Sequence, residues 1–288
     1  MEKMNYYMPD TLDEALSIMA SEDVIVLAGG SDLMVSGFNG TGVDPTFNKS
    51  VMIISPLKEL KGITKREDGS VIIGSLTTSR EIASSNLVHP LVRDAASRMG
   101  AVALRNSATI GGNIANASPK GDCPQPLILL DSYVILKSVD GEREVKVDDF
   151  ILGAKKTARK PNELITAVVI PQSNLTHYFF KKIGMRRANA ISKLTLSCGA
   201  EIRDGVVVDF RASSGAAGPK IMRSRQAEEI LIGKTLSELE GVEDEFLDAW
   251  NNVISPHAMA EYRRNTTRRM LKYFIDELRS GHPEGRVE

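Results

Sequence analysis

Two glycine pairs, Gly29-Gly30 and Gly111-Gly112, each interrupt an apolar stretch and have polar side chains beside them. Glycine lets the backbone adopt positive φ and lets another molecule approach closely, and consecutive N–H groups in such a backbone form a concave nest that suits a phosphate. The sequence therefore predicts that both loops hold one phosphorylated ligand between them. For either pair alone, a simple tight turn is the alternative interpretation. The polar residues beside the pairs are Ser31, Asp32, Thr109, Asn113 and Ser118.

Other kinds of reactive site are poorly supported. The two cysteines, Cys123 and Cys198, form no Cys-x-x-Cys pair, so the chain cannot hold an iron–sulfur cluster with four thiolates by itself. The four histidines are scattered, and we expect no metal site. No catalytic nucleophile–base arrangement stands out, and Cys123 is interpreted as a small buried apolar residue rather than a reactive thiol. We therefore expect no catalytic side chain, and a bound cofactor that carries the reaction.

The elements that must position the two loops are a mixture of helices and strands. An amphipathic helix is predicted at residues 11–20, where Thr11 and Glu14 form a capping box. Residues 106–118, which hold the second glycine pair, are predicted to be a loop. No Gly-x-Gly-x-x-Gly follows a strand, so a Rossmann nucleotide site is not indicated. Strands are predicted at residues 24–27, 51–54, 71–73, 133–136, 144–147 and 164–170, and helical spacing at 88–99.

A second domain is predicted after a break near residues 171–174. Alternating apolar residues at 194–202 predict a half-buried strand, and Asp204-Gly205 predicts a hairpin turn before a returning strand at 206–210. The sequence thus predicts an α+β chain with domains at 1–174 and 175–288, the first divided into lobes of about 1–55 and 56–174. Helices of the second domain are predicted at residues 220–232, 243–254 and 257–279.

The bulk properties are those of an ordinary soluble protein. The 288-residue chain has a net charge of -1, 42% hydrophobic and 25% charged residues, which indicates neither nucleic acid nor an anionic membrane as a partner. No apolar run approaches the roughly 20 residues that a bilayer span needs. The first residues lack the basic start and apolar core of a signal peptide, so a cytoplasmic location is expected.

Residues 27–33 and 105–113, with Ser118-Pro119 and Asp122 behind them, resemble the two FAD loops of the molybdenum hydroxylase flavoprotein family. These are the FAD-binding (medium) subunits of enzymes of the xanthine dehydrogenase and carbon monoxide dehydrogenase type. The order and spacing of the motifs over nearly the whole chain make the resemblance specific. It implies a two-lobed FAD-binding domain of the PCMH/vanillyl-alcohol-oxidase-like type, followed by a smaller α+β domain with an antiparallel sheet and helices. Further matching segments are 73–78, 149–150, 163–165, 170–171, 214–219, Arg223, 227–228 and 233–234.

The resemblance also implies which residues hold the cofactor. FAD would be bound non-covalently, because no histidine lies in the first loop, where related flavoproteins attach the ring. Backbone N–H groups of Gly29, Gly30 and Ser31 would bind the diphosphate. The residues implied to contact FAD are Val26, Leu27, Ala28, Gly29, Gly30, Ser31, Asp32, Leu33, Met99, Gly100, Thr109, Ile110, Gly111, Gly112, Asn113, Ser118, Asp122, Ile165 and Lys182.

Several of these residues carry specific expectations. Asp32 is unfavourable beside a diphosphate, so we expect it to accept hydrogen bonds from ribityl hydroxyls or backbone amides. Asp122 is expected to hydrogen-bond a cofactor hydroxyl, and Ile165 to pack on a cofactor ring. Lys182 matches the family's flavin-facing lysine, and its cation near the N1–C2=O edge would favour the reduced flavin; an ordinary surface lysine is the alternative. Asn189 stands where some xanthine dehydrogenases carry an aspartate near the flavin.

The function implied by the resemblance is that of an electron-transfer subunit. Electrons would pass from a molybdopterin large subunit through a 2Fe-2S small subunit to FAD on this chain, and then to NAD(P)+ or another acceptor. The assembly is expected to be a dimer of heterotrimers, and substrate hydroxylation is expected on a different chain. Two alternatives remain at this stage: a self-contained FAD-dependent oxidoreductase of the same superfamily, and a non-redox module that binds a phosphorylated ligand.

Overall fold

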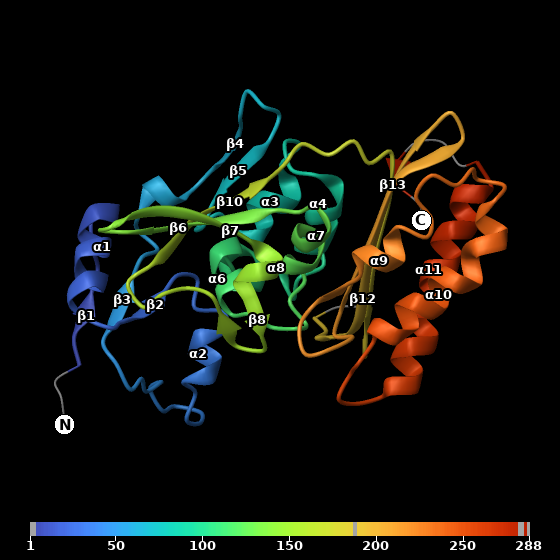
Figure 1. Ribbon diagram of the computed structural model, residues 1–288. Helices are drawn as coiled ribbons and strands as arrows, with labels where there is room; N and C mark the ends of the chain where they lie inside the picture. The colour runs from blue at the N-terminus through green and yellow to red at the C-terminus, as the bar shows by residue number, and fades with distance from the viewer. Residues whose placement is uncertain (1–3, 187–188, 282–284, 287–288) are drawn as a thin grey trace.

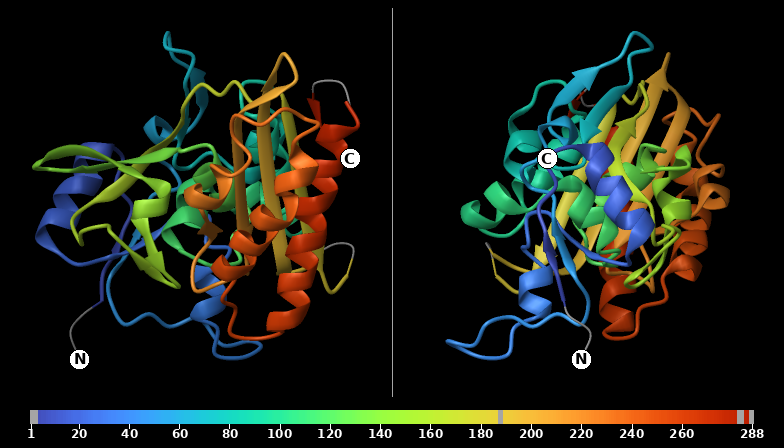
Figure 2. Two further views of the ribbon diagram at one scale, coloured as in Figure 1. Left: turned by 45° about the vertical axis from the view of Figure 1, so that its right-hand side comes forward. Right: turned by 90° about the vertical axis from the view of Figure 1, so that its left-hand side faces the viewer.

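The computed structural model describes residues 4–186, 189–281 and 285–286, and its sheets succeed one another along the chain (Figure 1). A small N-terminal sheet comes first, a central sheet with several short helices follows, and a C-terminal sheet comes last. The long helices α10 (Leu239–Val253) and α11 (Ala260–Arg279) lie on the face of the C-terminal sheet that is turned away from the rest of the chain (Figures 1 and 2). No helix among the described residues has the length and apolar character of a membrane span.

The N-terminal sheet is parallel and ends at the first glycine pair. Its strand order is β1 (Tyr6–Tyr7), β3 (Val51–Ile53), β2 (Ile25–Leu27). Helix α1 (Leu12–Ser21) confirms the predicted helix, and the Thr11 hydroxyl accepts a hydrogen bond from the Glu14 N–H at 3.2 Å. In a full capping box, the Glu14 carboxylate would also accept a hydrogen bond from the Thr11 N–H. It accepts one from the Asp10 N–H instead, so only half of the predicted capping box forms. After β2, the chain turns into the short helix α2 (Leu33–Ser36).

The central sheet is antiparallel and carries the second glycine pair on a helix at its side. Its strand order is β4–β5–β10–β6–β7, and the predicted strand at 164–170 is confirmed as β10. The predicted helical spacing at 88–99 is observed as α4. The strands of the central sheet are β4 Ile63–Lys65, β5 Val71–Gly74, β6 Tyr133–Ser138, β7 Gly141–Lys146 and β10 Leu164–Ile170. Strands β8 Ile151–Gly153 and β9 Lys156–Thr157 form a separate two-stranded sheet. The helices of this region are the 3-10 helix η1 Lys58–Leu60, α3 Ser79–Ser84, α4 Pro90–Ser97, α5 Val102–Ser107, α6 Ile110–Ala115, α7 Pro124–Leu129 and α8 Val147–Phe150.

The predicted loop at 106–118 is wrong, because this segment contains the end of α5 and the whole of α6. The Thr109 hydroxyl caps α6 by accepting a hydrogen bond from the Gly112 N–H at 3.2 Å. Ile110 and Ile114 are fully buried on one face of the helix. Their burial outweighs the roughly 1 kcal/mol by which each helical glycine is disfavoured relative to alanine.

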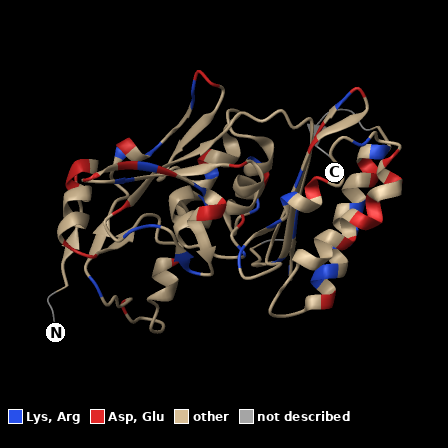
Figure 3. Cartoon of the chain, viewed as in Figure 1, with Lys and Arg blue, Asp and Glu red and all other residues tan. Residues whose placement is uncertain are grey.

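The C-terminal sheet follows the predicted hairpin. Strands β12 (Ser192–Arg203) and β13 (Val206–Gly215) pair antiparallel around Asp204-Gly205, within the order β14–β13–β12–β11–β15. The buried face of α11 includes Met270, Leu271 and Phe274, as its periodicity predicted. The charged residues of α10 are all acidic, and three of them pair with Arg268 and Lys272 of α11, so acidic and basic segments face each other across the two helices (Figure 3). The remaining bounds are β11 His177–Gly184, β14 Met222–Arg223, β15 Gly285–Arg286 and α9 Arg225–Glu228.

The predicted helix at 220–232 is largely wrong. Met222 and Arg223 form strand β14, which pairs with β13, and only the single turn α9 is helical before Gly233. Ser224 begins that turn, because its hydroxyl accepts a hydrogen bond from the Ala227 N–H at 3.2 Å. The segment follows the sheet edge because Arg223 donates hydrogen bonds to the Ile128 carbonyl and to Asp131, both far away in the sequence, which local helix propensity cannot foresee.

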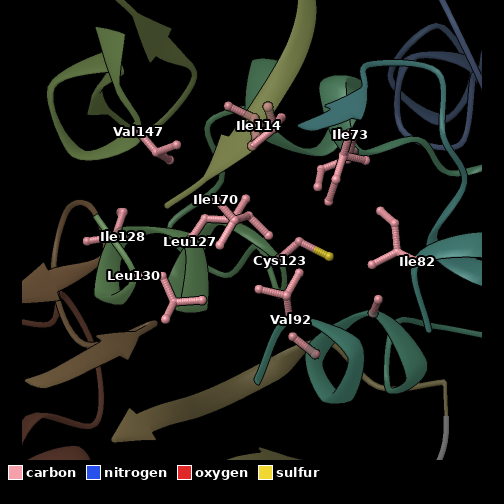
Figure 4. Packing of buried hydrophobic residues seen from close by; sticks show 14 of the residues in the cluster. Ile73, Ile82, Val92, Ile114, Cys123, Leu127, Ile128, Leu130, Val147 and Ile170 are labelled. Atoms are coloured by element: carbon pink, nitrogen blue, oxygen red, sulfur yellow. The ribbon is translucent and has the colours of Figure 1, made fainter. Parts of the chain in front are cut away.

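The largest hydrophobic core lies between the central sheet and its helices (Figure 4). Cys123 points into this core beside Val92 and is fully buried. Burial raises the pKa of its thiol, so the thiolate form is disfavoured at neutral pH. The interpretation of Cys123 as a small buried apolar residue is therefore confirmed. A separate core joins the C-terminal sheet to α10 and α11.

Candidate functional site

A cavity of about 870 Å³ lies between the N-terminal sheet, the helices beside the central sheet and the C-terminal sheet. Its walls come from the β2–α2 loop, from α5, α6 and the segment before α7, and from the β8–β9 turn. Lys182 of β11, residues 189–191 and Ser192 of β12 complete them. The volume lies within the roughly 300–1,000 Å³ that is usual for cofactor and small-molecule sites. The residues predicted from sequence that line it are 26–33, Met99, Gly100, Thr109, Gly112, Asn113, Ser118, Asp122 and Lys182.

The β2–α2 loop, residues Ala28 to Leu33, has the geometry expected of an anion-binding nest. Gly30 has a φ of +67°, and a Cβ added at Gly29 would lie 1.7 Å from the Ser107 carbonyl oxygen, so the loop rests directly on the α5–α6 connection. Among the hydrogen bonds between described residues, none is donated by the backbone N–H groups of Gly29 through Leu33. These donors are therefore available to a ligand in the cavity.

The second glycine pair differs from the expectation of a second nest. The N–H groups of Ile110 and Gly111 donate to the carbonyls of Thr77 and Ser75 at 3.0 and 2.9 Å, and the Gly112 N–H donates to the Thr109 hydroxyl. Neither glycine has positive φ. The ligand-facing group here is instead the Asn113 side chain, whose buried Oδ1 has no hydrogen-bond partner in the part of the chain that the structure describes.

Three predicted residues do not line the cavity. Ile110 and Ile165 are part of the central hydrophobic core, with 0% and 5% of their surfaces exposed. Gly111 is buried against the end of β5, where an added Cβ would lie 2.8 Å from the Ser75 carbonyl oxygen. These residues form the layer behind the cavity wall. Periodicity alone could not separate them from the wall, because the α6 register that places Gly112 and Asn113 outward was not foreseen.

A buried ion pair joins the central helices to the C-terminal sheet inside the cavity. Lys182 Nζ lies 2.6 Å from Asp122 Oδ2, and only 10% and 9% of these side chains are exposed. Lys182 also donates to the Arg98 carbonyl at 3.0 Å, and the Ser192 hydroxyl donates to Asp122 Oδ1 at 3.1 Å. Burial raises the pKa of Asp122, while Lys182 and Ser192 oppose that rise. Lys182 is thus not an ordinary surface lysine.

A second lysine at the cavity was not singled out from the sequence. Lys155, in the turn between β8 and β9, donates from Nζ to Asp32 Oδ2 at 3.2 Å and also to Asn116 Oδ1. No local signal distinguishes Lys155 from Lys156, because its partners come from distant parts of the chain. Asn189, which the sequence analysis placed near the flavin, also lines the cavity. The other lining residues that sequence reasoning missed are Ser36, Ala101, Leu104, Ala108, Ala115, Asn116, Lys120, Gly121, Ala190, Ile191 and Ser192.

The cavity provides binding groups rather than acid–base or nucleophilic groups. Its N–H donors and its lysines Lys120, Lys155 and Lys182 suit an anionic ligand, and its apolar residues suit flat rings. Among the described residues, no cluster of three or more His, Cys, Asp or Glu side chains could hold a metal ion. The arrangement therefore suits a large phosphorylated cofactor.

Comparison with known proteins identifies the family. The FAD binding domain in molybdopterin dehydrogenase matches residues 2–173, and the CO dehydrogenase flavoprotein C-terminal domain matches residues 178–278. The chain is 32% identical to the nicotinate dehydrogenase FAD-subunit of Eubacterium barkeri, over 82% of each chain. It is 30% identical to the xanthine dehydrogenase FAD-binding subunit of Escherichia coli O157:H7, over 95% of each. A solved structure of carbon monoxide dehydrogenase from Hydrogenophaga pseudoflava matches with a TM-score of 0.82 and 25% identity, over 94% of this chain and 95% of that one. This chain belongs to the family of FAD subunits of molybdenum hydroxylase-type dehydrogenases.

Proposed function

We propose that this chain is the electron-transfer subunit that connects a 2Fe-2S subunit, through FAD, to NAD(P)+ or another acceptor. The observation that carries the proposal is the nest of unpaired N–H donors at Gly29–Leu33 within a cavity of cofactor size. Substrate hydroxylation belongs to a partner chain that carries molybdopterin. We further propose that the complex is a cytoplasmic dimer of heterotrimers, and that the chain has domains at 1–174 and 175–288. The largest hydrophobic core lies mostly in the first of these, and a separate core lies in the second.

The residues of the cavity fit FAD. The N–H groups of Gly29 to Leu33 would hold the diphosphate, and the unpaired Asn113 amide oxygen would accept a hydrogen bond from the cofactor. The proposed FAD contacts are the predicted residues that line the cavity, while Ile110, Gly111 and Ile165 support its wall from behind.

Bound FAD would supply two-electron redox chemistry. The side chains of this chain bind, orient and tune the cofactor. Lys182 keeps a positive charge in the cavity wall, and Asp122 and the Arg98 carbonyl hold its ammonium in place. Because substrate hydroxylation takes place on the molybdopterin chain in this proposal, the isolated subunit should not oxidise purines or aldehydes.

Absorbance spectroscopy after FAD addition tests the binding half of the proposal. The purified chain should show flavin bands after gel filtration. Absence of flavin retention would favour the alternative of a non-redox module that binds another phosphorylated ligand.

Purification from the native source tests the partnership half. The chain should bring with it a cysteine-rich small subunit and a large molybdopterin subunit. A free monomer or homodimer with full turnover would instead favour the self-contained oxidoreductase.

A further inference from the structure

The side chain of Lys155 connects the two walls of the cavity. Its Nζ reaches Asp32 on the β2–α2 loop at 3.2 Å, and it also contacts Asn116 at the end of α6. Asp32 and Asn116 are more than eighty residues apart in the sequence. Asp32 lies shortly after the first glycine pair, and Asn116 lies shortly after the second. Among the described residues, no other side chain makes hydrogen bonds to both Asp32 and Asn116.

The backbone holds Lys155 at this position. Its N–H donates to the Ala117 carbonyl at 3.1 Å, which ties the β8–β9 turn to the end of α6. Lys155 has a φ of +60°, a conformation that glycine adopts with less strain than lysine. This conformation suits the second residue of the tight turn between β8 and β9, and the turn places Lys155 beside the end of α6.

The charge of Lys155 also explains how the Asp32 carboxylate can lie beside a diphosphate. A carboxylate beside a diphosphate is repulsive unless a cation lies close by. Asp32 precedes α2 but makes no capping hydrogen bond with it, so its carboxylate remains directed to Lys155. The pair is 66% and 57% exposed, and such an exposed pair contributes little by itself. A ligand that covers the pair would exclude water and strengthen the interaction.

We propose that Lys155 is a positioning residue for the diphosphate of FAD: it neutralises Asp32 and fixes the nest of the β2–α2 loop against the end of α6. This inference rests on the proposed function, since it assigns a role in holding the same cofactor. Lys155 acts through Asp32 rather than through direct contact with the reacting ring.

The test measures the Kd for FAD by fluorescence quenching in the full chain at low and high salt. Lys155→Met should raise Kd about tenfold at low salt, which corresponds to about 1.4 kcal/mol, and the difference from the parent should shrink at high salt. Lys156→Met is the matched control, because Lys156 is also exposed but does not line the cavity, and it should leave Kd unchanged. The Lys155→Met/Asp32→Asn double variant should regain most of the lost affinity.

Two results would overturn the inference: a Kd in Lys155→Met equal to that of Lys156→Met, or a loss that persists fully in the double variant. If the parent itself retains no FAD, the proposed function fails instead. In that case, NMR order parameters of residues 29–33 in the free protein still test the positioning role. They should fall in Lys155→Met and stay unchanged in Lys156→Met.

Discussion

At the scale of single residues, the Lys182–Asp122 pair sets the charge of the cavity wall. Removing either partner leaves the other as a poorly solvated charge at the edge of the site. The motif containing Lys182 could be found in the sequence, and so could Asp122. Their contact could not, because the two residues are sixty positions apart, Asp122 before α7 and Lys182 in β11. The sequence therefore predicted both residues but not the ion pair that they form.

Lys182→Met should lower the midpoint potential of bound flavin. Methionine keeps much of the stem and removes the cation that favours the reduced flavin. One charge-assisted hydrogen bond is worth about 1.5–3 kcal/mol, and about 30 mV corresponds to 1.4 kcal/mol for a two-electron couple. The expected fall is therefore on the order of tens of millivolts, measured by spectroelectrochemical titration.

The structure adds a control for this measurement. In Lys182→Met, the Asp122 carboxylate loses its cation, and its negative charge also disfavours the reduced flavin. The Lys182→Met/Asp122→Asn double variant removes both charges and should restore part of the potential. A potential in Lys182→Met that equals or exceeds that of the parent would contradict a flavin-tuning role for Lys182.

At the scale of elements, local pattern predicted those whose stability is local. The helix at 11–20 has its own cap and apolar face, and the strand at 164–170 is an apolar run interrupted only by Thr166; both are present. The errors at 106–118 and 220–232 occur where distant contacts decide the conformation. Ser75 and Thr77 accept the first N–H groups of α6, and the partners of Arg223 hold β14 at the sheet edge. No local window of sequence contains Ser75, Thr77 or Asp131 together with the residues that they hold.

The two glycines of α6 should differ in what their substitution damages. A side chain at Gly111 would meet the Ser75 backbone, so Gly111→Val should lower the free energy of unfolding by at least roughly 1–3 kcal/mol. A side chain at Gly112 would approach only the Thr109 hydroxyl and would project at the cavity, so Gly112→Val should abolish FAD retention. Urea unfolding and FAD fluorescence quenching measure the two effects.

These two outcomes separate the fold from the site. Retained FAD affinity in a folded Gly112→Val variant would exclude α6 as a wall of the FAD site. An unfolding free energy for Gly111→Val within error of the parent would show that α6 can move away from β5 without cost.

At the scale of the whole molecule, the cavity exists only because separate parts of the chain are docked together. Buried polar contacts join the central helices to the C-terminal sheet, and Arg223 makes several of them while only 4% of its side chain is exposed. Its guanidinium donates to the Ile128 carbonyl at 2.8 Å and to Asp131 at 2.9 Å on one side. On the other side, it donates to Glu228 at 2.9 Å. Sequence analysis predicted both domains, but it could not predict this interface.

Arg223→Met should destabilise the protein by about 3–5 kcal/mol, because it leaves Glu228 as a buried carboxylate without a cation. Urea unfolding, followed by the fluorescence of the single, buried Trp250, measures the loss. Burial already raises the pKa of Glu228, and Arg223 opposes that rise. Without Arg223, the folded-state pKa should rise further above its unfolded value, so the folded state binds the proton more tightly and the deficit should shrink as the pH falls.

Arg225→Met is the matched control for this interface. Arg225 also pairs with Asp131, but its side chain is 56% exposed, so its removal should cost no more than about 1 kcal/mol. The Arg223→Met/Glu228→Gln double variant should recover part of the loss, because the glutamine carries no charge and can still accept the Ala212 N–H. Equal losses in Arg223→Met and Arg225→Met, or a deficit that does not change with pH, would contradict the role of the buried Arg223–Glu228 pair in stabilising the C-terminal domain.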